Sequence, residues 1–188
     1  LRAFECDALT AYRGLPMIVV LPHTEQQIVD IVKICGQFAV PIVPRGAGTG
    51  LSGGAIPTEG SVVLSTSRMN QVLDIDPLQR VGVVQPGVRN LAVSEAASVY
   101  GLFYAPDPSS QLACTVGGNV AENSGGVHCL KYGLTLQNLL RVRGVLSSGE
   151  IVEIGSHSAD FGGLDLLPLI TGSEGMMLVV TEVSLRLL

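Results

Sequence analysis

The chain has 188 residues and a formal net charge of −5; 47% of its residues are hydrophobic and only 14% are charged. This length allows one domain with a substantial core, and an acidic balance without a basic tract argues against nucleic-acid binding as the main role. No apolar run approaches the roughly 20 residues that a membrane helix needs. We expect part of the apolar surface to face partners or segments outside this chain. The start at Leu1, without a signal-peptide pattern, predicts a piece of a longer protein.

The four cysteines are scattered and form neither a Cys-x-x-Cys pair nor a zinc-type spacing. Free thiols in a reducing cytosol are the simplest interpretation. We therefore expect a cytoplasmic protein with no metal site and no iron–sulfur cluster in this chain.

The first third of the chain reads as strand, helix, strand. An apolar run at 17–21 predicts a strand, and Thr24 with Gln27 predicts the capping box of a following helix. A second strand at 42–43 would pair in parallel with the first, and a third is predicted at 61–65. The helix should bury the face on which apolar residues recur at helical spacing, namely Ile28, Ile31, Val32, Cys35 and Phe38.

A glycine-rich loop follows the second strand: Pro44-Arg-Gly-Ala-Gly-Thr-Gly-Leu-Ser-Gly-Gly54. Consecutive free N–H groups in such a loop form an anion site suited to phosphate or pyrophosphate, and Arg45 adds forked donors. The G-x-G-x-x-G spacing at 48–53 also matches the dinucleotide fingerprint, but that motif requires a helix at its third glycine. Since another strand follows instead, we reject a Rossmann unit. A plain surface turn is the alternative for this loop taken by itself.

The rest of the chain predicts a mainly antiparallel part. Runs at 72–75 and 81–84 predict a hairpin, and alternating residues at 140–146 turn into a further strand at 151–154. The final run, at 181–187, alternates in the same way. Between these strands we predict a helix that is capped by Asn90, ends at Gly101 and carries an apolar stripe of Val93, Ala96, Ala97 and Tyr100.

Two further clusters complete the pattern. The first begins with Tyr104-Ala-Pro-Asp-Pro-Ser-Ser110 and continues through Cys114-Thr-Val-Gly-Gly-Asn119, Ala121-Glu-Asn-Ser-Gly-Gly126 and Lys131-Tyr-Gly-Leu-Thr135; the second is Thr171-Gly-Ser-Glu-Gly-Met176 with Val179-Val-Thr-Glu-Val183. With the glycine loop, these motifs resemble the FAD-binding domains of the vanillyl-alcohol oxidase type, above all the glycolate oxidase and D-lactate dehydrogenase branch. The resemblance covers nearly the whole chain, with several separate motifs in the family's order.

The resemblance implies an α+β, PCMH-type FAD-binding fold. A small parallel α/β lobe at 1–70 would be followed by a larger, mainly antiparallel lobe at 71–188, with FAD between them. The glycine loop would hold the pyrophosphate, the second cluster would approach the ribityl chain and flavin ring, and 174–180 would lie near the adenosine half. The cofactor-binding residues implied are Pro44, Arg45, Gly46, Ala47, Gly48, Thr49, Gly50, Leu51, Ser52, Asp107, Ser110, Thr115, Gly117, Gly118, Glu122, Asn123, Ser124, Gly125 and Val180.

Simpler roles compete at several of these positions. Asp107 lies in an ordinary Asp-Pro turn pattern and Asn123 lies beside glycines, so both can be turn residues, although we favour cofactor contact. His23 and His157 are expected at the surface, and His128 can lie near the flavin. A histidine beside a cysteine is no nucleophile–base pair without geometry, so no catalytic residue is named in this chain.

Two positions depart from the family pattern. Relatives that bind flavin covalently have a histidine where this chain has Thr49, which predicts non-covalent FAD, although Cys114 leaves a cysteinyl bond open. Leu178 stands where a glycine is expected. If that position required a positive φ, the leucine would be strained and the adenosine contact would be in doubt.

The resemblance implies FAD-dependent oxidation of a small 2-hydroxy acid, glycolate first and D-lactate second, with hydride passing to the flavin. Electrons would then leave through partner subunits of a complex, with the protein cytoplasmic or peripheral to the inner membrane. The substrate carboxylate and the base would lie largely in a C-terminal cap domain outside these residues. The alternative is an FAD-binding assembly or electron-transfer subunit without substrate turnover of its own.

Overall fold

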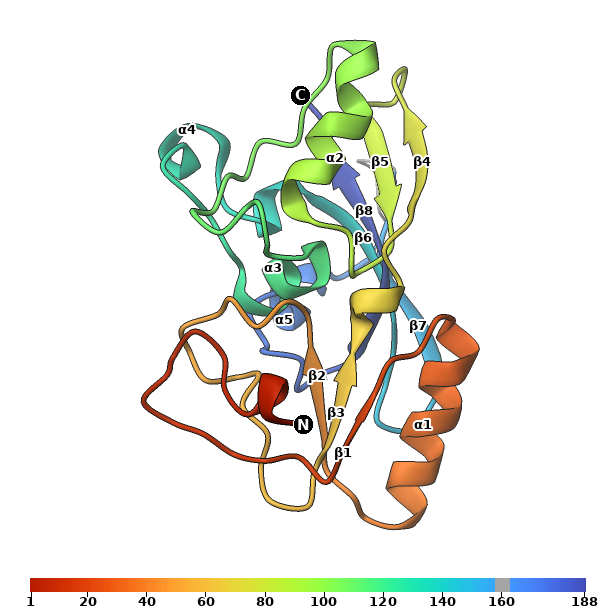
Figure 1. Ribbon diagram of the computed structural model, residues 1–188. Coiled ribbons are helices and arrows are strands. Elements are labelled where there is room, and N and C mark those ends of the chain that lie inside the picture. Colours follow the sequence, from red (N-terminus) through yellow and green to blue (C-terminus); the bar gives the residue numbers. More distant parts are fainter. Residues whose placement is uncertain (158–162) are drawn as a thin grey trace.

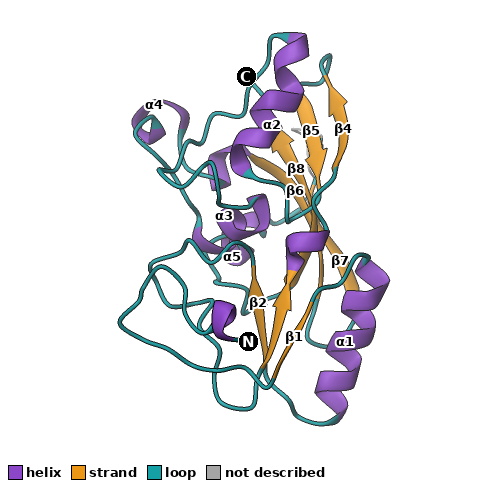
Figure 2. Cartoon of the chain, viewed as in Figure 1, coloured by secondary structure: helices purple, strands orange, loops and turns teal. Residues whose placement is uncertain are grey.

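The chain forms two β-sheets with helices packed against them, so the predicted α+β class is confirmed. The computed structural model describes residues 1–157 and 163–188. The smaller sheet occupies the lower half of the view in Figure 1 and most of the larger sheet the upper half. Long loops lie beside the smaller sheet (Figure 2). Within the described residues, no helix combines the length and apolar character needed to cross a bilayer.

The smaller sheet is parallel throughout. Its strands are β1 (Ile18–Val20), β2 (Ile42–Arg45) and β3 (Val62–Ser65), in the order β1-β3-β2. The predicted direct pairing of the first two strands is therefore wrong, because β3 lies between them. All four residues of β3 are buried, and a strand that is apolar on both faces is best covered at the centre of a parallel sheet. The glycine loop thus leaves an edge strand.

Helix α1 (Glu25–Gln37) begins as the sequence predicts. Thr24 accepts a hydrogen bond from the backbone N–H of Gln27, whose side chain in turn accepts from the N–H of His23. Three of the five predicted core positions are buried, whereas Ile31 is half-buried and Phe38 is 73% exposed. Phe38 departs because it follows the last helical turn, where Ala39 takes a positive φ and redirects the chain.

The larger sheet has the order β4-β5-β8-β6-β7, with antiparallel neighbours. Both predicted hairpins are present, and the C-terminal strand lies between them at the centre of the sheet. The strands are β4 (Val72–Asp76), β5 (Val81–Val84), β6 (Leu139–Val145), β7 (Ile151–Gly155) and β8 (Val179–Arg186).

Helix α2 (Asn90–Ala97) corrects the predicted cap. Arg89 occupies the cap position and makes no side-chain cap bond. The Asn90 amide instead donates to the carbonyl oxygen of Pro106 and accepts from Asn119, so it links separate segments. Gly101 has a φ of 71° and ends the following 3-10 turn, as predicted, but that turn leaves Tyr100 53% exposed.

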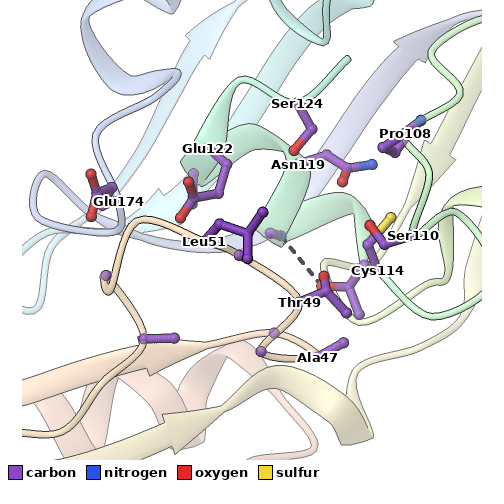
Figure 3. A pocket seen from close by; sticks show the side chains of 18 of the residues that line it. Ala47, Thr49, Leu51, Pro108, Ser110, Cys114, Asn119, Glu122, Ser124 and Glu174 are labelled. Atoms are coloured by element: carbon purple, nitrogen blue, oxygen red, sulfur yellow. Dashed lines mark hydrogen bonds between the residues drawn. The ribbon is translucent and has the colours of Figure 1, made fainter. Parts of the chain in front are cut away.

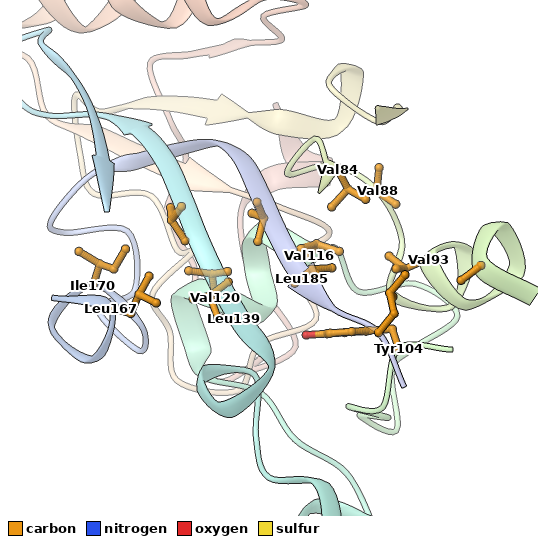
Figure 4. Close-up of a cluster of buried hydrophobic side chains, with 14 of the residues drawn as sticks. Val84, Val88, Val93, Tyr104, Val116, Val120, Leu139, Leu167, Ile170 and Leu185 are labelled. Carbon is orange, nitrogen blue, oxygen red and sulfur yellow. The ribbon is translucent and has the colours of Figure 1, made fainter. Parts of the chain in front are cut away.

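Two cores hold these layers together. The larger lies between the antiparallel sheet and its helices α2, α3 (Val116–Glu122) and α5 (Leu167–Ile170), as Figure 4 shows. The short helix α4 (Cys129–Tyr132) projects from the molecule in Figure 1. In the second core, Ile28 and Val32 of α1 pack with Val145 and Val179 of the larger sheet. This core spans both sheets, and a lobe boundary at residue 70 stays a prediction.

Candidate functional site

A cavity of about 330 Å³ lies between the glycine loop and α3 (Figure 3). Residues 108–110 and 114–115 add a further part of its wall, and Glu174 lies at one end. The structure brings most of the predicted residues together in its lining: Pro44, Gly46, Ala47, Gly48, Thr49, Gly50, Leu51, Ser110, Thr115, Gly118, Glu122, Ser124 and Gly125.

Two glycines allow the loop to adopt its position. A Cβ on Gly46 would lie 2.3 Å from Thr115 Oγ1, so only glycine permits the loop to approach the start of α3 this closely. Thr115 is itself fixed as the N-cap of α3, where it accepts from the N–H of Gly118. Gly48 has a φ of +72°, and a Cβ there would lie 2.1 Å from Arg45 Nη2. The loop therefore has a fixed, tightly supported conformation.

The loop also offers unused donors. Within the described part of the chain, the backbone N–H groups of residues 47–51 make no hydrogen bond. Consecutive amides of this kind form a concave site for an anion, to which each contributes a partial positive charge. Loop and cavity together can hold a phosphate-bearing ligand against the chain's backbone.

Two carboxylates face the same cavity. The hydroxyl of Ser52 lies 2.8 and 2.9 Å from the two carboxylate oxygens of Glu122, which fixes this side chain beside the loop. Glu174 takes a positive φ of 54°, and a Cβ on Gly54 would lie 2.4 Å from its Oε2. Carboxylates are acceptors only, so they suit the hydroxyl groups of a ligand and not its phosphates.

Comparison with known proteins decides the family. The family model described as "FAD binding domain" matches residues 16–155. The chain belongs to this FAD-binding family. It is 56% identical to the glycolate oxidase subunit GlcD of Escherichia coli over 98% of the chain, and 45% identical to that of Bacillus subtilis over 98%. It is also 40% identical to a D-lactate dehydrogenase of Archaeoglobus fulgidus over 90% of the chain.

These relatives are longer proteins, since the chain spans 37% to 39% of their length. Among solved structures, an alkyldihydroxyacetonephosphate synthase matches with a TM-score of 0.80 and 27% identity, over 90% of this chain and 33% of that one. The predicted resemblance to the glycolate oxidase and D-lactate dehydrogenase branch, and to the D subunit of bacterial glycolate oxidase in particular, is confirmed.

FAD is the cofactor of the family, and the residues present fit it. Because Gly46 and Gly48 carry no side chain, the loop packs closely against Thr115 and Arg45, and the amides of 47–51 stay open to a pyrophosphate. The carboxylates of Glu122 and Glu174 line the same cavity and supply acceptors of the kind that the hydroxyls of a ribityl chain or ribose require.

Arg45 lies under the loop and not in the cavity lining. Its Nη1 donates to the carbonyl oxygen of Ala55, and its guanidinium stacks on the ring of Phe4 at 5.5 Å. Burial lowers the pKa of Arg45, an effect that the nearby charge of Asp7 opposes. The side chain thus supports Gly48 from below. With Gly117 and Val180, Arg45 also lines a smaller hollow of about 50 Å³ that adjoins the cavity.

Asp107 and Asn123 lie beside the cavity and outside its lining. The Asp107 carboxylate contacts His128, 2.5 Å from its Nδ1. Asn123 takes a positive φ of 49° as the C-cap of α3, and its Oδ1 accepts from the N–H of Leu136. These contacts match the turn-residue interpretation of Asn123, whereas a direct contact of either side chain with FAD stays a prediction.

Eight lining residues are absent from the predicted cofactor-binding set: Gly54, Ala55, Pro108, Ser109, Cys114, Asn119, Ala121 and Glu174. Asn119 is 1% exposed and donates to Asn90 Oδ1 at 2.7 Å. Its place in the Gly-Gly-Asn motif, within a cluster assigned to the cofactor, could have marked it. As a buried amide it needs a hydrogen-bond partner, which Asn90 supplies. Ala121 carries no chemical group that a single sequence could mark.

Two family departures can now be placed. Cys114 lines the cavity but is buried, and burial raises the pKa of its thiol, which disfavours the thiolate needed to attack a flavin. Leu178 is 5% exposed and has no positive φ. It packs against the larger sheet, because a Cβ on Gly144 would lie 2.5 Å from its Cδ1. The strain considered for Leu178 is therefore absent.

Proposed function

We propose that this chain is the FAD-binding part of a flavoprotein that oxidises a small 2-hydroxy acid, with glycolate as the first candidate and D-lactate as the second. The observation that carries the proposal is the cavity walled by the glycine loop, whose amides at 47–51 have no partner among the described residues. The names of the relatives supply the substrate class, since they include glycolate oxidase subunits and a D-lactate dehydrogenase.

Each part of the cavity has a distinct task in this proposal. FAD, when bound, would supply the acceptor for a hydride from the substrate. The loop amides would hold the pyrophosphate, and the Glu122 carboxylate fixed by Ser52 would accept from a ribityl or ribose hydroxyl. The tight contact between Gly46 and Thr115 holds the loop against α3. The chain therefore binds and orients the cofactor.

Substrate binding requires groups from elsewhere. Among the described residues, the cavity lining contains no histidine, lysine or arginine, and its ionisable groups are two carboxylates and the thiol of Cys114. We propose that a cap domain of the full-length protein supplies the cation for the substrate carboxylate and the base. Electrons then leave through partner subunits, with the protein cytoplasmic or peripheral to the inner membrane.

Anaerobic mixing of full-length, FAD-loaded protein with glycolate and with D-lactate tests this function. We expect the visible flavin band to bleach with glycolate, and more slowly with D-lactate. Loss of the band with neither acid, in protein that retains FAD, would contradict the proposal and favour an assembly or electron-transfer subunit.

A further inference from the structure

Two segments without regular secondary structure wall the cofactor cavity and meet just outside it. Residues 108–110 line the cavity from one segment, and residues 124–125 from the other. Behind this wall, Nδ1 of His128 lies 2.5 Å from Oδ2 of Asp107, and the backbone N–H of His128 donates to Asp107 Oδ1 at 3.4 Å. One carboxylate therefore receives two contacts from one residue across the junction.

The backbones also touch at this junction. A Cβ on Gly126 would lie 1.9 Å from the carbonyl oxygen of Asp107, so the two segments are in direct contact. Pro106 and Pro108 remove two backbone donors from the first segment. Side-chain contacts therefore help to fix its conformation, and they include the bond from Asn90 to Pro106 and the His128–Asp107 pair.

We propose that His128 is a positioning residue for the cofactor cavity, which it shapes through Asp107. The contact holds the 108–110 wall against the 124–125 wall, so the cavity keeps its width when empty. This inference rests on the proposed FAD site. The Asp107 carboxylate is engaged by His128 and acts through the wall that it anchors.

The surroundings of the imidazole agree with a fixed orientation. The ring of Tyr132 lies 6.4 Å from that of His128, and Tyr132 in turn packs edge-on against Phe103. The His128 side chain is 62% exposed and that of Asp107 21%. A contact this open contributes a modest free energy, so a matched set of variants is needed to see it.

His128→Asn and His128→Leu form the decisive pair, because asparagine places an amide donor near the position of Nδ1 and leucine places a methyl group there. We expect His128→Leu to bind FAD about fivefold more weakly than wild type and His128→Asn to stay within about twofold, as measured by quenching of flavin fluorescence. His23→Leu, the same change at an exposed histidine before α1, is the control and should bind as wild type does.

Hydrogen exchange in protein stripped of FAD tests the wall itself. The amides of Gln111, Ala113 and Cys114 bond to carbonyls of Pro108 and Ser110, and they should exchange faster in His128→Leu and in Asp107→Ala. The double variant should show no further increase, because each single change already removes the same contact, that between His128 and Asp107.

Three outcomes would overturn the proposal: unchanged exchange in either single variant, additive effects in the double variant, or weak FAD binding by His128→Asn. Failure of wild type to bind FAD would instead contradict the proposed function, while the exchange result stands by itself.

Discussion

Gly48 is the residue at which the shape of the loop depends most directly on a missing side chain. Its φ of +72° strains any residue with a Cβ, and a Cβ there would lie 2.1 Å from the Arg45 guanidinium. Arg45 has no room to move aside freely, because it is buried, bonded to Ala55 and stacked on Phe4. A side chain at Gly48 must therefore move the loop.

We expect Gly48→Val to abolish measurable FAD binding while the fold survives. The branched side chain would clash with the Arg45 guanidinium beneath the loop, and the displaced loop would no longer aim its amides at the pyrophosphate. Gly36→Val is the matched control, since a Cβ on Gly36 meets nothing within 4 Å. Titration with FAD, with circular dichroism to check folding, measures both. Equal affinity in the two variants would show that the loop is only a turn.

At the same scale, Thr49 and Cys114 decide how the cofactor is attached. A threonine hydroxyl cannot form a histidyl link to flavin, and burial raises the pKa of the Cys114 thiol and keeps it protonated. We expect acid precipitation to release all of the yellow colour into the supernatant. Colour that stays in the pellet of wild type but not of Cys114→Ser would identify a cysteinyl bond.

At the scale of elements, α1 is tied to the larger sheet by charges as well as by the core. Arg143 on β6 donates from two nitrogens to the Glu25 carboxylate, at 2.8 and 2.9 Å, and Thr181 on β8 donates to the same carboxylate at 2.7 Å. Arg143 also pairs with Glu153 on β7. Forked donors meeting a carboxylate form one of the stronger polar contacts in proteins.

This contact makes stability depend on pH. The hydrogen bond from Arg143 lowers the pKa of Glu25 in the folded state. The stabilisation is thus complete above the ordinary glutamate pKa and is lost as the pH falls through the lowered value. We expect Glu25→Gln to cost about 1–2 kcal/mol of unfolding free energy at pH 7 and to flatten the acid limb of the stability profile. Urea unfolding across this pH range measures both effects.

The exposed Glu59 provides the matched control. Glu59→Gln should leave both the unfolding free energy and its pH dependence as in wild type. If Glu25→Gln shows the same acid limb as Glu59→Gln, the contact between Glu25 and Arg143 makes no net contribution to the unfolding free energy.

Sequence patterns predict where helices and strands form better than they predict which elements lie side by side. The cap at Thr24, the hairpins and the stop at Gly101 follow from local backbone chemistry, and all are present. The order β1-β3-β2 depends on which strand is buried on both faces. The role of the Asn90 side chain depends on its hydrogen bond with Asn119, 29 residues away. Contacts between residues this far apart in the sequence produce no periodic pattern in the local sequence.

The site shows the same division. Glycine spacing predicts the loop, because close approach and positive φ exclude other residues, and most implied residues do line one cavity. The orientation of Arg45 and the pairing of Asp107 with His128 depend on segments that only the fold brings together. A side chain's type was readable from the sequence, but its direction was not.

At the scale of the whole molecule, the cavity is built to hold a cofactor and is poorly suited to attract an acid substrate. Its two carboxylates, Glu122 and Glu174, are the charged residues of its lining among those described. They repel the carboxylate of a 2-hydroxy acid, and an interaction of this kind is weakly screened in a cleft. We therefore expect the opposite charge and the base to come from the proposed cap domain of the full-length protein.

We therefore expect the 188-residue chain, loaded with FAD, to oxidise glycolate far more slowly than full-length protein. Fixing a substrate against the flavin with groups in register can contribute roughly 7–11 kcal/mol toward the barrier, and the described lining of the cavity offers no cation for that purpose. Dye-coupled glycolate oxidation by both forms, at equal flavin content, measures the difference. Comparable turnover would place the base within this chain after all, and His128, beside the cavity wall, would be the first residue to replace.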